Sequence, residues 1–267
     1  MNIFNTILFS PLANGLVIFY RLFFNNMGLA IIGFTLALKL VLAPMTKQQL
    51  DMMKKMKEFQ PQLDKLKKKY KNNKEGLMKA QSEFYKQKGI NPGAGCLPMI
   101  LQLVILFALL QVFLKALTGI DPTKLNELLY APLKFHAHEL INTRFLYLDI
   151  TKPDTINIPG IPFAIPGLIL ILAAISQMIS AKISSPYLEA TEKAAKKTPG
   201  ATDDFASAMQ TSAVYTFPLM TLLIGGRFPS GVALYWVVFS VYQTIQQYRS
   251  TGLGGLKSWM KVLRIKV

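Results

Sequence analysis

Residues 27–70 read MGLAIIGFTLALKLVLAPM followed directly by TKQQLDMMKKMKEFQPQLDKLKKKY, and the contrast between these two halves decides the fold class. The first half, residues 27–45, is apolar throughout apart from Lys39. A bilayer core of roughly 30 Å is crossed by about 20 apolar residues in a helix, so this half predicts a membrane span. The second half is rich in lysine and predicts a helix that is exposed to water.

The composition of the whole chain agrees with a membrane protein. Hydrophobic residues make up 51% of the 267 residues and charged residues 16%, and the mean hydropathy is +0.32. Soluble domains carry roughly 25% charged residues, so a soluble enzyme of ordinary composition is disfavoured. The net charge of +16 on its own suggests nucleic acid or an anionic membrane surface as a partner. One cysteine excludes an intramolecular disulfide, and two histidines leave little scope for zinc chemistry.

Four more apolar runs follow the first, although glycine, proline and glutamine interrupt the later ones. We therefore predict five spans, at residues 27–45, 97–117, 161–183, 212–228 and 231–248. The stretch 1–26 contains Pro11, Asn14 and Arg21 within an apolar background. This pattern predicts a helix that lies in the membrane interface, with a spanning helix as the alternative.

The lysine and arginine counts of the connecting segments predict the orientation, because cytoplasmic loops carry an excess of these residues. Segment 46–90 has 13 lysines against five acidic residues, and the tail 249–267 has five basic residues and no acidic one. Segment 118–160 has four basic and five acidic residues. We expect 118–160 to be an extracytoplasmic loop, 184–211 a cytosolic loop and 249–267 a basic cytosolic tail. The N-terminus is then outside and the C-terminus inside, and DNA is not an expected partner.

The cytosolic segment 46–90 predicts a helical hairpin. Apolar residues of its first helix are spaced four and three apart and form one seam: Met52, Met56, Phe59, Leu63, Leu66 and Tyr70. A second helix with Leu77 and Phe84 follows a break near Gly76. The lysines are either a solvated face that sets the orientation, or a docking surface for acidic lipid, ribosomal RNA or a targeting partner.

Lys39 is the candidate at the centre of the predicted site. A charged side chain at the bilayer centre costs at least about 2.5–3.5 kcal/mol, and the five predicted spans contain no Asp or Glu. The sequence favours a water-accessible, positively charged cavity, with the alternative that Lys39 only extends to the cytosolic interface. Neutral polar residues are expected to line the cavity: Thr35, Gln102, Ser176, Gln177 and Gln243. Each glutamine and serine has an alternative role as a hydrogen-bond link between helices.

Four stretches, collinear along the chain, resemble the YidC/Oxa/Alb family of membrane protein insertases. They are residues 33–70, NPGAGCLPMILQLVILFALLQV (91–112), FLYLDITKPD (145–154) and FPSGVALYWVVFSVYQTIQQ (228–247). The resemblance implies an all-α polytopic membrane protein with five transmembrane helices around a hydrophilic groove and a cytosolic αα-hairpin, in a short form without a large periplasmic domain. The groove arginine of the family corresponds to Lys39. Further groove positions are implied at Gln177 and Trp236, with Tyr235 beside the latter.

The same resemblance implies a function at the bacterial plasma (inner) membrane. Such proteins insert nascent membrane proteins, alone or with the Sec translocon, and help them to fold. We expect a multi-pass protein that is monomeric when active, with anionic lipid or the ribosome as a further partner of the basic tail. The sequence shows no catalytic motif, so we expect no enzyme, cofactor or metal site. The alternative class is a small-solute transporter or channel, whose usual internal repeat is not seen.

Overall fold

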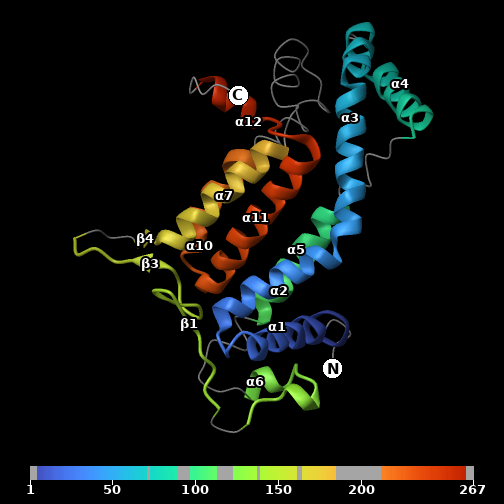
Figure 1. Cartoon of the computed structure of the whole chain (residues 1–267). Helices are drawn as coiled ribbons and strands as arrows, with labels where there is room; N and C mark the ends of the chain where they lie inside the picture. Colours follow the sequence, from blue (N-terminus) through green and yellow to red (C-terminus); the bar gives the residue numbers. More distant parts are fainter. Residues whose placement is uncertain are drawn as a thin grey trace. The chain divides into compact units, whose positions relative to one another are not determined.

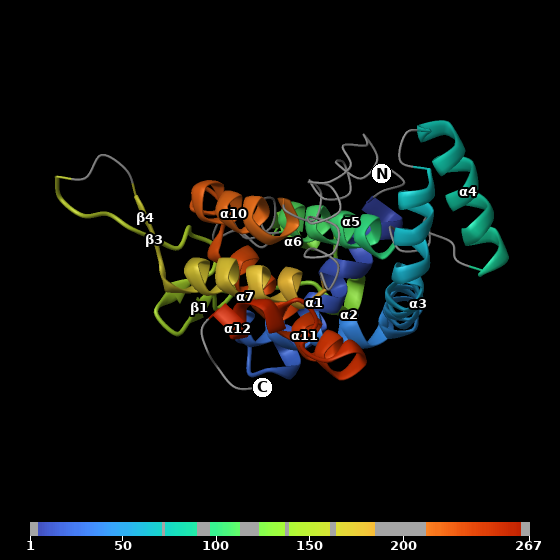
Figure 2. The ribbon, with the colours of Figure 1, turned by 90° about the horizontal axis from the view of Figure 1, so that it is seen from above.

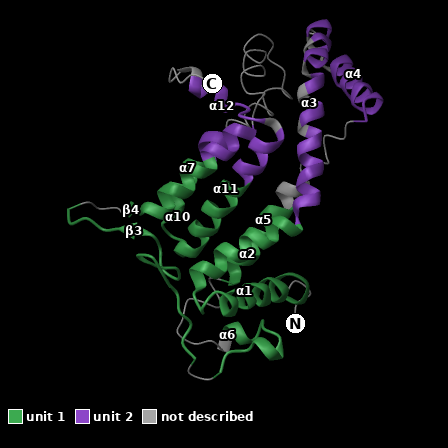
Figure 3. Ribbon diagram, in the orientation of Figure 1, with its two compact units in different colours: residues 1–41, 101–177, 218–242 green, residues 42–100, 178–217, 243–267 purple. Residues whose placement is uncertain are grey.

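The computed structural model describes residues 5–70, 73–89, 97–112, 123–136, 139–160, 164–184 and 212–262. This part of the chain is largely helical, and its strands are only two residues long (Figure 1). The expected all-α fold class is thereby confirmed. The chain divides into two compact units, shown in Figure 3. The first unit comprises residues 1–41, 101–177 and 218–242, and the second comprises 42–100, 178–217 and 243–267.

The helices vary widely in length. In chain order they are η1 (Asn5–Phe9), α1 (Ser10–Leu22), α2 (Met27–Val41), α3 (Ala43–Lys69), α4 (Lys74–Gln87), α5 (Leu97–Val112), α6 (Thr123–Asn126), η4 (Ala131–Leu133), α7 (Leu168–Ser184), η5 (Ser212–Thr216), α10 (Phe217–Gly225), α11 (Ser230–Thr251) and α12 (Leu256–Val262). Two antiparallel strand pairs lie between η4 and α7. They are β1 (Arg144–Phe145) with β2 (Leu148–Asp149), and β3 (Thr155–Ile156) with β4 (Ile165–Pro166).

In the first unit, α1 packs closely on α2. Gly15 on α1 lies against the Phe34 ring of α2, so that a Cβ at Gly15 would be 2.5 Å from a ring carbon. The centroid of the Phe34 ring is 6.0 Å from that of Phe19. Glycine at this position therefore lets two short apolar helices approach and bury an aromatic cluster between them.

The described parts of the loop before β1, residues 123–136 and 139–142, are tied to α1 by hydrogen bonds. The buried Asn14 side chain donates from Nδ2 to the Leu128 carbonyl at 3.0 Å and accepts from the Tyr130 N–H at 2.8 Å. The Asn142 N–H donates to the Tyr20 hydroxyl at 2.9 Å. Because Asn14 satisfies backbone groups that would otherwise be left unpaired, α1 and this loop form one structural element.

The segment around β2 caps the start of α11. The N–H groups of Ser230 and Gly231 donate to the carbonyls of Lys152 at 2.7 Å and Ile150 at 3.0 Å. The first N–H groups of a helix have no partner inside it, and here the chain supplies carbonyls from residues about 80 positions earlier. Asp149, whose carboxylate accepts from the Thr151 hydroxyl at 2.7 Å, holds this segment in shape.

Asp154 and Tyr147 cap the start of α7 in the same way. The Asp154 carboxylate is buried and accepts from the Leu170 N–H at 2.9 Å, while the Tyr147 hydroxyl accepts from the Ile169 N–H at 3.0 Å. The hydroxyl in turn donates to the same carboxylate at 3.1 Å. Desolvation of the hydroxyl at this cap, together with its bond to a carboxylate, raises the pKa of Tyr147 above its usual value, although the side chain is 57% exposed. The β3–β4 pair next to this cap projects away from the helices (Figure 2).

The second unit contains two helices, α3 and α4, in the segment where the apolar seam predicts a hairpin. Helices α3 and α4 contact each other through the rings of Phe59 and Phe84, whose centroids are 5.9 Å apart, and Leu63 of the seam is buried. Asn73 caps α4 by accepting from the Gly76 N–H at 2.8 Å. Helices α3 and α4 thus contact each other, while the bounds of the hairpin and its cytosolic position stay predictions.

By length and hydropathy, none of the described helices qualifies by itself as a membrane span, but α2 and the following Ala43–Met52 meet the requirement together as a bent pair. Shorter apolar helices occur at Leu101–Val112, Leu168–Ser184 and Ser212–Gly225. Each lies within or overlaps one of the predicted spans, and the number of spans stays a prediction.

Candidate functional site

Lys39 is a buried cation packed against an aromatic ring. Only 7% of its surface is exposed, although it lies near the end of α2. Its Nζ lies 3.2 Å from the centroid of the Phe239 ring and 6.0 Å from that of Tyr242, both on α11. All three residues belong to the first unit. The ring quadrupole attracts a cation in this position, which gives the ammonium a favourable partner where water is largely excluded.

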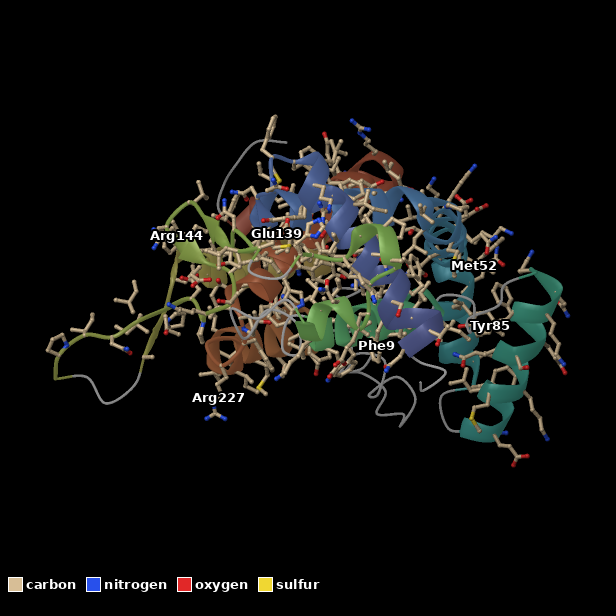
Figure 4. All side chains as sticks on the ribbon, turned by 90° about the horizontal axis from the view of Figure 1, so that it is seen from below. Phe9, Met52, Tyr85, Glu139, Arg144 and Arg227 are labelled. Atoms are coloured by element: carbon tan, nitrogen blue, oxygen red, sulfur yellow. The ribbon has the colours of Figure 1, made fainter. Side chains whose placement is uncertain are left out.

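The site has no acidic counter-ion in the part of the chain that the structure describes. Lys39 is absent from the ion pairs found there, which join Lys54 to Asp51, Lys79 to Glu75 and Lys152 to Asp149. Two arginines of the first unit, Arg144 and Arg227, are exposed and point away from the helices (Figure 4). Lys39 therefore differs from them in being held inside the unit with its charge not neutralised by a described carboxylate.

An aromatic face on α11 carries this interaction. Tyr235, Phe239 and Tyr242 are four and three residues apart, so they share one side of the helix; we call them the aromatic face. The ring centroids of Tyr235 and Phe239 are 5.9 Å apart. Tyr235 is buried, and its hydroxyl accepts a hydrogen bond from Nε2 of Gln102 on α5. The aromatic face thus connects α11 to α2 at Lys39 and to α5 at Gln102.

A second polar contact joins α7 to α10. The Thr221 hydroxyl donates to Oε1 of Gln177 at 2.8 Å, and Thr221 is buried. Ser176, next along α7, donates to the Ala173 carbonyl at 2.9 Å within its own helix. Gln177 therefore takes part in a hydrogen bond between two helices, and its role in a groove stays a prediction.

The remaining expected site residues lie on the same helices. Thr35 is buried one turn before Lys39, and its hydroxyl donates to the Ile31 carbonyl at 2.6 Å. Trp236 is half-buried next to Tyr235 on α11. Gln243 is also half-buried on α11, but it belongs to the second unit. The role of these three residues in a groove stays a prediction.

The structure adds three residues that the sequence analysis did not single out. They are Phe239 and Tyr242, which face Lys39, and Thr221, which pairs with Gln177. The spacing of the aromatic residues in the sequence indicates that they share one side of a helix. The sequence does not show that this side contacts Lys39 instead of lipid.

The chemistry that these groups offer is a positive charge and hydrogen bonds. Lys39 supplies the charge, and the Gln102 amide and the Tyr235 hydroxyl supply neutral polar groups near the aromatic face. Among the described residues, no group of three or more His, Cys, Asp or Glu side chains is placed to hold a metal ion. The arrangement suits attraction of an anionic group from a partner molecule.

In the second unit, a basic residue also meets an aromatic ring. Lys182 near the end of α7 is buried, and its Nζ lies 5.4 Å from the centroid of the Trp259 ring on α12. Gly254, just before α12, lies so close to the Ile183 carbonyl that a Cβ there would be 2.1 Å from the oxygen. The tail helix α12 therefore packs against the end of α7 with its tryptophan.

Comparison with known proteins gives consistent matches over most of the chain. The family model described as "60Kd inner membrane protein" matches residues 15–252. A protein of Fusobacterium nucleatum subsp. nucleatum named "Membrane protein insertase YidC" is 33% identical over 224 residues, which is 84% of this chain and 85% of that protein. Proteins of the same name from Pelobacter propionicus and Chlorobium luteolum are 32% and 33% identical.

The relatives differ in length. The match to the Pelobacter protein covers 91% of this chain but 38% of that protein. The match to the Chlorobium protein covers 85% of this chain but 33% of that protein. It therefore spans about a third of the length of these two relatives and most of the length of the Fusobacterium one. The matches confirm the resemblance inferred from the four collinear sequence stretches. The chain belongs to the family described as 60Kd inner membrane protein, whose similar relatives carry the name Membrane protein insertase YidC.

Proposed function

We propose that the protein inserts nascent membrane proteins into the bacterial inner membrane and helps them to fold, alone or with the Sec translocon. The name of its relatives supports an insertase role. The observation that carries the mechanism is Lys39, a buried cation whose described partner is an aromatic ring instead of a carboxylate. A charge that is kept without neutralisation is available to attract an acidic group of a client.

The physical problem for a client is its extracytoplasmic tail. An acidic or polar tail does not cross about 30 Å of hydrocarbon unaided, because its polar groups have no partners there. We propose a hydrophilic groove that extends partway into the bilayer and shortens this path. Lys39 attracts acidic tail residues, and Thr35, Gln102, Ser176, Gln177, Tyr235, Trp236 and Gln243 supply the polar surface of the groove. The apolar helix of the client then partitions into lipid, which needs no nucleotide hydrolysis.

We further propose the topology that the charge counts indicate. It has an interfacial helix at 1–26, five spans, an outside N-terminus and an inside C-terminus. Reporter fusions after Lys71 and Lys257 should give a cytosolic signal, and a fusion after Asn126 an extracytoplasmic one. An extracytoplasmic signal at Lys71 would contradict the orientation.

The two basic segments are proposed to receive partners on the cytosolic side. The hairpin 46–90 is proposed to receive clients, so its deletion should slow insertion while the membrane core still folds. The tail 249–267 is proposed to bind anionic lipid, at about 1 kcal/mol per basic residue near the surface. Co-sedimentation of tail-truncated protein with ribosomes, at several salt concentrations, separates this role from ribosome binding.

Reconstitution of the purified protein in liposomes tests the function. Two matched clients are supplied during cell-free synthesis, identical except that the tail of one carries acidic residues and that of the other neutral ones. Protection of the client tail from external protease measures insertion. We expect Lys39→Ala to lower insertion of the acidic client more than that of the neutral client, and Lys39→Arg to be nearly neutral. Equal insertion of the acidic client by Lys39→Ala would refute the role of the charge, and solute flux without insertion would favour a transporter.

A further inference from the structure

We infer that Phe239 is a positioning residue for the Lys39 ammonium, and that it thereby sets the preference of the protein for clients with acidic tails. This inference rests on the proposed function. It adds a residue that neither the name of the relatives nor the sequence analysis assigns to the site. The geometry on which it stands is the ring centroid 3.2 Å from Nζ.

Lys39 lies two positions before the end of α2 at Val41, and lysine has a long flexible side chain that can carry its charge toward water. The neighbouring Leu40 and Val41 are 64% and 73% exposed, in contrast to the 7% of Lys39. The ammonium is therefore retained inside the unit while the end of the helix is close, and a specific attraction is needed to keep it there.

The Phe239 ring is a partner of moderate strength for the ammonium. A cation against a desolvated aromatic face is favoured by a factor of about 5 to 30 over the same cation without the ring. A carboxylate in the place of the ring would bind more strongly and would cancel the charge. Phe239 holds the ammonium firmly enough to position it, and loosely enough that an acidic group of a client can replace the ring.

The Phe239 ring is itself held by a neighbour on the aromatic face. Tyr235 packs on Phe239 with their centroids 5.9 Å apart, and Gln102 holds the Tyr235 hydroxyl. Tyr242 lies on the same face, but its centroid is 6.0 Å from Nζ, nearly twice as far as that of Phe239. The contact is therefore specific to one ring, and substitution of Tyr242 should have the smaller effect.

The test uses the full-length protein in liposomes with the acidic and neutral clients described above. Phe239→Leu keeps an apolar side chain but removes the aromatic face, and Phe239→Tyr restores the face. The matched control is Phe34→Leu, because Phe34 is a buried aromatic residue of the same unit that packs between α1 and α2. Folding of each variant is checked by its elution from a gel-filtration column in detergent.

We expect Phe239→Leu to lower the ratio of acidic to neutral client insertion by about 5- to 30-fold, with Phe239→Tyr close to the wild type. Phe34→Leu should leave the ratio unchanged, whatever its effect on the amount of folded protein. A second measurement uses phenylalanine with increasing fluorine substitution at position 239. Fluorine withdraws charge from the ring face while the shape is nearly kept, so the ratio should fall step by step along the series.

An unchanged ratio in Phe239→Leu, or equal loss of both clients, would overturn the positioning role. A ratio that stays constant along the fluorinated series would also overturn it, because packing alone does not depend on the charge of the ring face. Failure of the proposed function has a different signature. In that case the wild-type protein inserts neither client, or Lys39→Ala inserts the acidic client as well as the wild type does.

Discussion

The cap that Asp154 forms on α7 leads to a quantitative prediction for stability. Replacement by alanine removes two hydrogen bonds to a buried carboxylate, from the Leu170 N–H at 2.9 Å and from the Tyr147 hydroxyl at 3.1 Å. Hydrogen bonds to charged groups contribute about 1.5–3 kcal/mol each. Because Tyr147 is partly open to solvent, the lower end of this range applies to each of the two bonds. Asp154→Ala should therefore destabilise the protein by about 3 kcal/mol.

Two further variants separate the contributions. Asp154→Asn keeps an oxygen that accepts from Leu170 but loses the charge, so its effect should be about half as large. Tyr147→Phe removes both the donor to Asp154 and the acceptor for the Ile169 N–H. Because these residues form one network, Asp154→Ala and Tyr147→Phe should not be additive, with an interaction of about 1 kcal/mol in a double-mutant cycle.

The measurement is thermal unfolding of the purified variants in one detergent, followed by tryptophan fluorescence. A loss of about 3 kcal/mol corresponds to an unfolding midpoint lower by roughly 6–12 °C for a chain of this size. Glu127→Ala is the control, since Glu127 is an exposed carboxylate of the same loop region and should change stability by about 0.5 kcal/mol or less. A midpoint for Asp154→Ala equal to that of this control would refute the capping role.

Three other perturbations follow from the structure. Tyr235→Phe removes the bond from Gln102 and should destabilise the protein by about 1 kcal/mol, measured as a lower unfolding midpoint; no change would show that the amide finds another partner. Burial alone would raise the pKa of Asp149, but hydrogen bonds from a nearby threonine outweigh it and the net pKa is lowered. This group therefore adds stability above its unfolded pKa of 3.8 that is lost as the pH falls through the lower folded value, so the acid-induced loss should be smaller in Asp149→Asn. Trp259→Ala removes the ring next to Lys182 and should increase hydrogen exchange in α12, whereas Trp259→Phe should preserve much of the protection.

The fold class was predictable, and Lys39 stood out as a candidate, because both depend on local sequence. An apolar run long enough to span a bilayer is visible residue by residue, and so is the periodic seam of the hairpin, because a helix presents every third or fourth residue on one face. A lysine inside such a run stands out for the same reason. The structure confirms the helical class, and it places Lys39 in the interior of the first unit.

The partners of these residues depend on which helices become neighbours, and this only the tertiary structure decided. Lys39 and Phe239 are 200 positions apart, and no local pattern shows that the aromatic face of α11 turns toward α2. The same holds for Asp154, whose carboxylate is used by the first turn of α7 across an intervening strand pair. A buried charge or an unpaired N–H must find a partner, and the sequence reveals that need. Which side chain meets it is set by the packing of segments that are distant along the chain, because burial and hydrogen bonding act between neighbours in space.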